Sequence, residues 1–197
     1  MLFRSLVNKY GEAISHEGWK HTVELADQVC DIWNRKDVGI WEMRGEQHHF
    51  LHSRLMCWVA LDRAIRLASK RSLPAPFARW DQTRQAIYAD IWGNFWNEER
   101  GHFVQHTGST ALDGSMLLMP LVRFVAATDP RWLSTLAAIQ KSLVRDGMVY
   151  RYRNDDSQID GLQGTEGAFA ACSFWYVECL ARARQVEKAH LEFERSE

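Results

Sequence analysis

Residues 37–70 read DVGIWEMRGEQHHFLHSRLMCWVALDRAIRLASK, a polar and aromatic loop that runs straight into a long apolar segment. The same order returns twice, after the loops at 101–112 (GHFVQHTGSTAL) and 148–167 (MVYRYRNDDSQIDGLQGTEG). The pattern recurs about every 50–60 residues, with a more polar helical segment between copies, as is typical of toroids in which no unit buries its core alone. We therefore expect the three loops to lie on one rim of an all-α assembly.

Hydrophobic spacing predicts two kinds of helix in alternation. The outer helices are amphipathic, with one apolar stripe each, and we expect them at His16–Arg35, Ala75–Phe95, Asp129–Arg145 and from Gln185 onward. The inner helices are apolar nearly all round and belong in the interior, and we expect them at Phe50–Lys70, Gly114–Ala126 and Gly167–Arg184. Pro120 predicts a kink or a late start in the second inner helix. The extended segments His102–Gln105 and Val149–Arg153 could pair as a short β ribbon on the rim.

This order predicts a partial (α/α)6 toroid of about three to four helix pairs, because a closed ring needs about six pairs, or ~350 residues. The chain has 197 residues, and we expect residues 1–197 to form a single partial domain. Its end helices should expose apolar flanks, which favours association with further copies of the chain, a homo-oligomer.

Composition excludes several function classes. The net charge of −1, with acids and bases mixed along the chain, leaves no basic stripe for nucleic acid. No apolar run approaches the ~18–20 residues that span a membrane, and no signal peptide is apparent at the N-terminus. The four cysteines lack CxxC spacing, so we predict buried free thiols and a cytoplasmic location over a disulfide framework or zinc site. The histidines form no ligand pair, and we predict no metal and no cofactor.

Glu42 is the strongest catalytic candidate. It lies in Gly39–Gly45 (GIWEMRG), beside Trp41 and at the entry to an inner helix. An acid packed by an indole is partly desolvated, which suits a general acid that protonates a glycosidic oxygen. The alternative, that Glu42 pairs with Arg44 or caps the following helix, is equally open on pattern alone.

The third loop supplies further candidates. Glu166 sits between glycines at an inner-helix entry and could complete an acid/base pair or complement the helix dipole. Arg151 and Arg153 share a face of an extended segment and could clamp sugar hydroxyls, or pair with Asp155 and Asp156. Asp113 is expected to be a helix cap rather than a ligand.

The sequence resembles glycoside hydrolase family 15, the glucoamylase, glucodextranase and trehalase family, in its bacterial trehalase/glucoamylase-like branch. The motifs that carry the resemblance run in family order across nearly the whole chain: Gly39–Gly45, His52–Leu67, Arg100–Gln105, Leu112–Leu121, Asp146–Arg153 and Gly164–Trp175.

The resemblance implies an (α/α)6 barrel that hydrolyses terminal α-glucosyl bonds with inversion. It places the general acid on Glu42 and the aromatic that packs the sugar on Trp41. Arg151 and Tyr152 fall on an Arg-Tyr pair that lines the glucose subsites, and Glu166 lies in the corresponding cup as a substrate-binding candidate. Arg44, on the same rim loop as Glu42, is a further substrate-binding candidate. The substrate would be α,α-trehalose or an α-1,4-glucosyl oligosaccharide.

The chain also departs from the family pattern. The family's general base comes from a later rim loop, and its N-terminal β-sandwich and first barrel helices precede the matched region, so we expect the base to lie outside this chain. Glu166 is the obvious base by spacing but does not match the family's base. A catalytically inactive carbohydrate-binding or interaction module is therefore the alternative function, and a helical scaffold without a sugar site is a third.

Overall fold

The computed structural model describes residues 14–152 and 168–195. The long helices are α2 (His16–Ile32), α3 (Leu51–Arg71), α4 (Phe77–Asn94), α6 (Pro130–Leu143), α7 (Ala170–Arg182) and α8 (Val186–Glu194). Between α4 and α6 lie the 3-10 helix η1 (Gly114–Leu117) and the single turn α5 (Leu118–Leu121). The predicted outer helices and two of the three predicted inner helices are confirmed to within a few residues at their ends.

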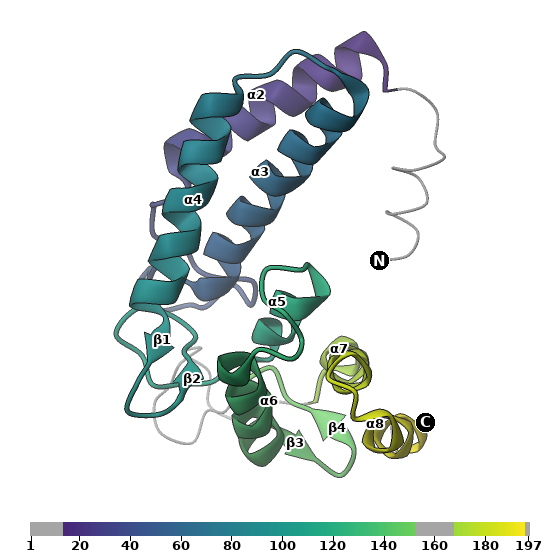
Figure 1. Ribbon diagram of the computed structural model, residues 1–197. Coiled ribbons are helices and arrows are strands. Elements are labelled where there is room, and N and C mark those ends of the chain that lie inside the picture. The colour runs from purple at the N-terminus through teal and green to yellow at the C-terminus, as the bar shows by residue number, and fades with distance from the viewer. Residues whose placement is uncertain (1–13, 153–167, 196–197) are drawn as a thin grey trace.

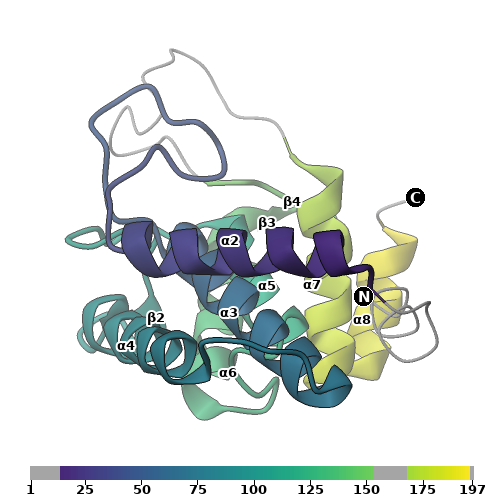
Figure 2. The same ribbon diagram turned by 90° about the horizontal axis from the view of Figure 1, so that it is seen from above.

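The helices follow one another in an arc (Figure 1). At one end α3 packs against both α2 and α4, and at the other end α7 packs against α8 and contacts η1 and α5. Figure 2 shows that the loop between α2 and α3 extends on the side where β4 and the start of α7 lie. The arrangement therefore places the first loop and residues 148–152, the described start of the third loop, on the same side of the helices.

Local sequence explains where two of the outer helices begin. Ser15 caps α2 by accepting a hydrogen bond from the Gly18 amide at 3.1 Å. Asp129 caps α6 by accepting from the Arg131 amide at 2.9 Å, and Pro130 follows at the first helical position. Proline fits there because its missing N–H would have no partner in the first turn.

The second inner helix is much shorter than predicted. We expected Gly114–Ala126, but the regular helix ends at Leu121. Pro120 lies inside α5, has no amide hydrogen to donate, and is followed by Arg123 in the left-handed region at φ 65°. A left-handed backbone angle is incompatible with a continuing right-handed helix, so the chain turns at Arg123 instead.

The predicted ribbon is also wrong in its pairing. β2 (His102–Phe103) pairs with β1 (Trp96–Asn97), and β3 (Val144–Arg145) pairs with β4 (Met148–Val149), both antiparallel. Positive φ angles at Gly101 and Gly147 allow the tight local turns. Closing a short loop costs less conformational entropy than joining two distant segments, so neighbours pair first.

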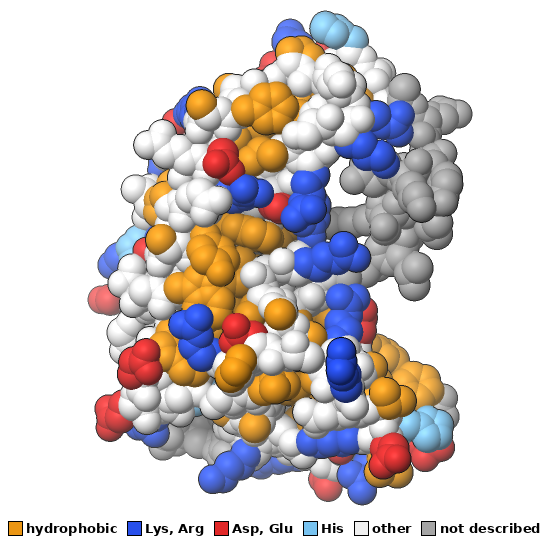
Figure 3. All heavy atoms as spheres, viewed as in Figure 1, with side chains coloured by type: hydrophobic (Ala, Val, Ile, Leu, Met, Phe, Trp, Pro, Cys, Tyr) orange, Lys and Arg blue, Asp and Glu red, His pale blue; other side chains and the backbone are white. Residues whose placement is uncertain are grey.

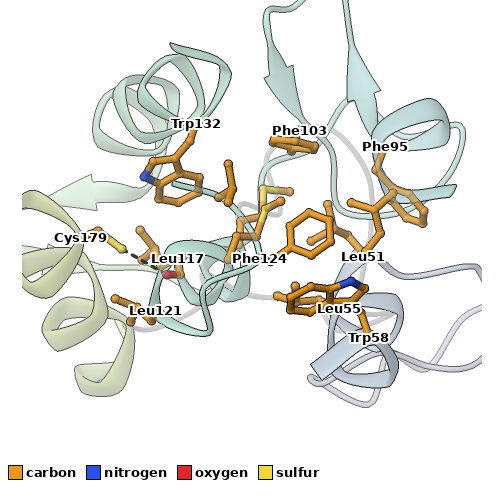
Figure 4. Close-up of a cluster of buried hydrophobic side chains, with 14 of the residues drawn as sticks. Leu51, Leu55, Trp58, Phe95, Phe103, Leu117, Leu121, Phe124, Trp132 and Cys179 are labelled. Atoms are coloured by element: carbon orange, nitrogen blue, oxygen red, sulfur yellow. Dashed lines mark hydrogen bonds between the residues drawn. The ribbon is translucent and has the colours of Figure 1, made fainter. Parts of the chain in front are cut away.

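One hydrophobic core runs from Trp19 of α2 to Ala189 of α8, and Figure 4 shows its central part between α3 and α7. Phe124 packs edge-on against Trp58 with their ring centroids 5.1 Å apart. The Cys179 thiol donates to the Leu117 carbonyl at 3.1 Å, which ties α7 to η1. Four tryptophans are buried in this core, Trp19, Trp58, Trp80 and Trp132, and Trp33 and Trp175 are among those partly buried against it.

Helix α3 carries two buried charges that its apolar pattern concealed. Arg54 and Asp62 are both buried. The Asp62 carboxylate accepts from Arg66 at 2.8 Å and from Arg84 of α4 at 3.1 Å. A buried charge is tolerated only when such partners replace water, so these pairs fix how α3 packs on α4.

Apolar side chains are exposed on the end helices, as expected for a partial toroid: Leu25 on α2, Phe174 on α7, and Val186, Leu191 and Phe193 on α8. Figure 3 shows the molecule as a crescent that is hollowed on one flank, with Lys and Arg side chains along that flank. Among the described residues, no helix combines the length and the apolar character that a membrane span needs.

Candidate active site

The loop between α2 and α3 presents the two central candidates, Trp41 and Glu42. Backbone hydrogen bonds close it near both ends, from the Asp37 amide to the His48 carbonyl at 2.9 Å and in return at 3.0 Å. The Asp37 carboxylate also accepts from the Gly39 amide at 2.6 Å and from the Ser53 hydroxyl at 2.9 Å. The loop is therefore a defined structure attached to the first turn of α3.

Arg54 anchors the base of this loop. Its side chain is 4% exposed and pairs with Asp90 of α4 at 3.1 Å. The same guanidinium donates to His49 Nδ1 at 2.6 Å and to the carbonyl oxygens of Trp33 and Arg35. One cation thus holds the beginning and the end of the loop together and against α4.

Glu42 stands at the tip of the loop. Its backbone has a φ of 52°, a left-handed conformation, and the next residue, Met43, is buried. The Glu42 side chain is exposed, and within the described residues its carboxylate makes no hydrogen bond or ion pair. The expectation that the indole would pack over and desolvate this acid is therefore wrong, because the chain turns the carboxylate outward.

The two alternatives for Glu42 are not seen either. Neither an ion pair with Arg44, which is also exposed, nor a cap on α3 occurs among the described contacts, since Phe50 is the N-cap residue of α3 and makes no side-chain cap. The carboxylate is thus open to a ligand.

The Trp41 indole points to a buried carboxylate instead. Its N–H donates to both oxygens of Asp113, at 3.1 and 3.0 Å, across 72 residues of sequence. The ring meets Phe169 edge-on with centroids 5.5 Å apart. Trp41 therefore connects the first loop to Asp113, which follows the second loop, and to Phe169 at the start of α7.

Asp113 is 3% exposed and has more partners than a helix cap needs. The predicted cap is confirmed, because the carboxylate accepts from the Ser115 amide at 2.6 Å. It also accepts from the Gln105 side-chain amide at 2.9 Å. The contact with Trp41 was missed by sequence reasoning, since a capping aspartate carries no signal of a partner so far along the chain.

Arg151 lies against the same aromatic group. Its guanidinium carbon is 5.4 Å from the Trp41 ring centroid and 5.9 Å from that of Phe169. The Arg151 carbonyl accepts from the Gly114 amide at 2.7 Å, which fixes the backbone beside Asp113. Arg151 and Trp41, predicted from separate loops, are thus brought together as a cation over an indole.

Tyr152 is 3% exposed and packs in a small cluster with Met43 and Phe50, beneath the loop that carries Glu42. Four other candidates of the third loop lie outside the described residues: Glu166, Arg153, Asp155 and Asp156.

Histidines surround the junction of the first two loops. The rings of His48 and His106 are stacked, with centroids 4.2 Å apart. Burial lowers the pKa of His106, partly offset by its hydrogen bond to the Thr107 carbonyl, while His48 lowers it further. Burial also lowers the pKa of His52, against the opposing effect of Asp113 and Asp37. Within 14–152 and 168–195, no three His, Cys, Asp or Glu side chains gather as a metal site would require.

Comparison with known proteins decides the family. The family model described as glycosyl hydrolases family 15 matches residues 1–194. The chain belongs to this family. It is 40% identical to a trehalase of Mycobacterium tuberculosis over 181 residues, which are 92% of this chain and 26% of that protein. A trehalase of Thermoplasma acidophilum is 32% identical over 189 residues, 95% of this chain and 32% of that protein. The chain thus spans about a quarter to a third of the length of these relatives.

Solved structures agree on the fold. A wild-type glycosidase superposes with a TM-score of 0.74 at 26% identity, over 89% of this chain and 45% of that one. A glucoamylase from Saccharomycopsis fibuligera superposes with a TM-score of 0.67 at 15% identity, over 88% of this chain and 41% of that one. The all-α, partial (α/α)6 toroid predicted for the family 15 chain is confirmed, and it amounts to about half of such a barrel.

Proposed function

We propose that this family 15 chain forms the general-acid side of a site that hydrolyses terminal α-glucosidic bonds with inversion. Glu42 is the proposed general acid. The observation that carries the proposal is the exposed Glu42 carboxylate at the tip of an anchored loop, directly after an indole fixed by Asp113 and covered by Arg151. Relatives named trehalases support α,α-trehalose as the substrate, with α-1,4-glucosyl oligosaccharides as the second choice.

The chemistry assigns one proton transfer to Glu42. Its protonated carboxyl gives a proton to the glycosidic oxygen as the bond from that oxygen to the anomeric carbon breaks. A second carboxylate takes a proton from the water that attacks the opposite face of the anomeric carbon. Inversion requires the two carboxyl groups to stand roughly 6.5–9.5 Å apart, which leaves room for that water. We propose that this general base comes from a later rim loop of the family, outside residues 1–197.

We propose the sugar contacts from the same arrangement of side chains. The Trp41 ring offers an apolar face of the kind that sugars stack on, while Arg151 and Arg44 offer hydrogen-bond donors to hydroxyls. We propose Glu166 as a further contact from the third loop. Tyr152 is buried under Met43 and Phe50, so we propose that it acts on the substrate indirectly, by supporting the loop.

The decisive experiment measures glucose release from trehalose and from maltose by the full chain. It compares the wild type with Glu42→Gln and with Glu46→Gln, a matched control in which an exposed acid of the same loop is neutralised. Release that is lost in Glu42→Gln and kept in Glu46→Gln supports the general acid. Equal release from all three proteins would show that another group supplies the proton.

Because the proposed general base lies outside residues 1–197, we expect this chain alone to release glucose slowly or not at all. If no variant releases glucose but the wild type binds glucose in a titration, the chain by itself is a carbohydrate-binding module, and the role of Glu42 is then tested by the same comparison with the general base supplied. Absence of both hydrolysis and binding would refute a sugar site in this chain.

Two wider proposals follow from the described residues. All four cysteines are free thiols, which favours a reducing compartment and a cytoplasmic location. The exposed apolar side chains of α2, α7 and α8 favour homo-oligomers, because exposed apolar area of this kind is unusual on monomers. Light scattering of the purified chain at two concentrations tests the second proposal.

A further inference from the structure

We infer that Asp113 is a positioning residue, which sets the place of the Trp41 indole beside Glu42. The expected effect of Asp113 on sugar binding rests on the proposed function. The contact between Asp113 and Trp41 rests on the geometry alone. Among the described residues, Asp113 hydrogen-bonds to the first loop through the Trp41 indole, so we infer that it influences Glu42 through Trp41 rather than by touching the substrate.

The Asp113 carboxylate is a junction of three segments. It accepts from the Trp41 indole in the α2–α3 loop, from the Gln105 amide after β2, and from the Ser115 amide in η1. Hydrogen bonds to an ionised acceptor are stronger than bonds between neutral groups, and burial at 3% exposure strengthens them further. The three segments are therefore held at one point by one charge.

The partner segments are themselves fixed. The Gln105 amide donates to the Ala111 carbonyl at 2.9 Å, and the Gln105 carbonyl accepts from the Leu51 amide at 2.9 Å, at the start of α3. Gln105 is 2% exposed, so its side chain has little freedom to leave the carboxylate. The Asp113 carboxylate therefore holds the Trp41 indole at a fixed place relative to the start of α3.

The indole in turn sets two groups of the proposed site. Arg151 stands over its ring at 5.4 Å, and Phe169 meets it edge-on at 5.5 Å. Glu42 follows Trp41 directly in the chain, so a displacement of the Trp41 backbone would also displace Glu42. Loss of the contact with Asp113 would free the indole and therefore disturb the stacking face and the cation that lies over it.

A second capping aspartate provides the comparison. Asp129 caps α6 by accepting from the amides of Arg131 and Trp132, both in its own helix. Asp113 caps the four-residue η1 and also accepts hydrogen bonds from side chains of two other segments, Trp41 and Gln105. Capping alone does not explain those extra bonds.

The test uses two substitutions that separate the cap from the indole contact. Asp113→Ser keeps a hydroxyl that can cap the Ser115 amide but is too short to reach Trp41. Asp113→Asn replaces one acceptor oxygen by a donor, which would face the donors of Trp41 and Gln105. Asp129→Asn is the matched control.

The first readout is the indole ¹H–¹⁵N resonance of Trp41, identified by its absence in Trp41→Phe. We expect this resonance to move in Asp113→Ser and Asp113→Asn and to stay in place in Asp129→Asn. An unchanged resonance in both Asp113 variants would overturn the inference, whatever the activity of the chain.

The second readout is glucose affinity in a double-mutant cycle. We expect Asp113→Ser and Trp41→Phe each to weaken glucose binding by about tenfold, the usual scale for one hydrogen bond to a charged group, and the double variant to lose no more than either single one. Additive losses would show that Asp113 does not act through Trp41 and would overturn the inference. If the wild type binds no glucose, the proposed function fails, and the indole resonance alone decides whether Asp113 positions Trp41.

Discussion

Replacing Arg54 by methionine should destabilise the protein far more than removing an arginine from the same helix surface. Methionine fills much of the volume of the arginine stem but cannot pair with Asp90, whose side chain is 22% exposed. It also leaves His49 and the carbonyl oxygens of Trp33 and Arg35 without their donor.

The magnitude follows from the partners left behind. Breaking a buried ion pair from one side costs about 3–5 kcal/mol, and the partial exposure of Asp90 argues for the lower end, about 3 kcal/mol. The loop acceptors add to this, although water can reach some of them once the side chain is gone. We expect Arg54→Met to lower the free energy of unfolding by about 3–4 kcal/mol.

The assay is urea unfolding followed by circular dichroism, with Arg66→Met as the control. Arg66 also lies on α3 and pairs with Asp62, but its side chain is 62% exposed, and Asp62 keeps Arg84 as a partner. An exposed pair is worth about 0–1 kcal/mol. Equal effects of the two substitutions would refute the reasoning that Arg54 locks the loop to α3 and α4.

Three further predictions concern packing and titration. A Cβ on Gly114 would lie 2.9 Å from Cys172 Sγ and 3.1 Å from the Tyr150 carbonyl oxygen, so Gly114→Ala should cost about 1–3 kcal/mol in chemical denaturation; an unchanged midpoint would show that the neighbours yield. Burial raises the pKa of Cys172 to about 12, so this thiol should resist iodoacetamide at about pH 8 in the native protein, while the partly exposed Cys30 reacts; rapid labelling of both would contradict the packing. Burial lowers the pKa of His106 in the folded protein, so the stability that the neutral ring contributes is complete above about pH 6.5 and is lost as the pH falls through the folded-state pKa. Between about pH 7 and pH 5, the free energy of unfolding of His106→Gln should therefore fall less than that of the wild type. Equal falls in the two proteins would exclude His106 as the cause of the pH dependence.

Much of the helical framework could be predicted because its signals are local. Ser15, Asp129 and Pro130 mark helix starts within one turn of the residues they serve. Apolar spacing on α2 and α6 likewise reports which face is buried. Such signals need no knowledge of the rest of the chain.

The predictions of secondary structure failed where the outcome depends on backbone turns or on pairing with another segment. Residues 114–126 looked like one apolar helix, yet the left-handed turn at Arg123 ends it early. His102–Phe103 paired with its neighbour Trp96–Asn97 rather than with the distant strand of similar pattern. Alternation in sequence shows that a segment is extended but does not name its partner.

The site shows the same limit more sharply. The Trp41–Asp113 contact spans 72 residues and joins an aromatic to what reads as an ordinary cap. Arg54 was not singled out by the sequence pattern, yet it is buried and holds the loop. The roles of Asp113 and Arg54 can be recognised only when their partners are known. A buried charge depends on hydrogen-bond partners from other segments, and the sequence pattern of its own segment does not show them.

Together these contacts explain how the backbone that carries an exposed carboxylate is held in place. The loop is held at its base by Arg54 and near its tip by the bond from Trp41 to Asp113. Glu42, between a fixed indole and the buried Met43, keeps a left-handed backbone that a free loop would relax. A residue fixed on both sides in this way presents its carboxylate outward without ordering a flexible segment when a ligand arrives, which is the property a proposed general acid needs.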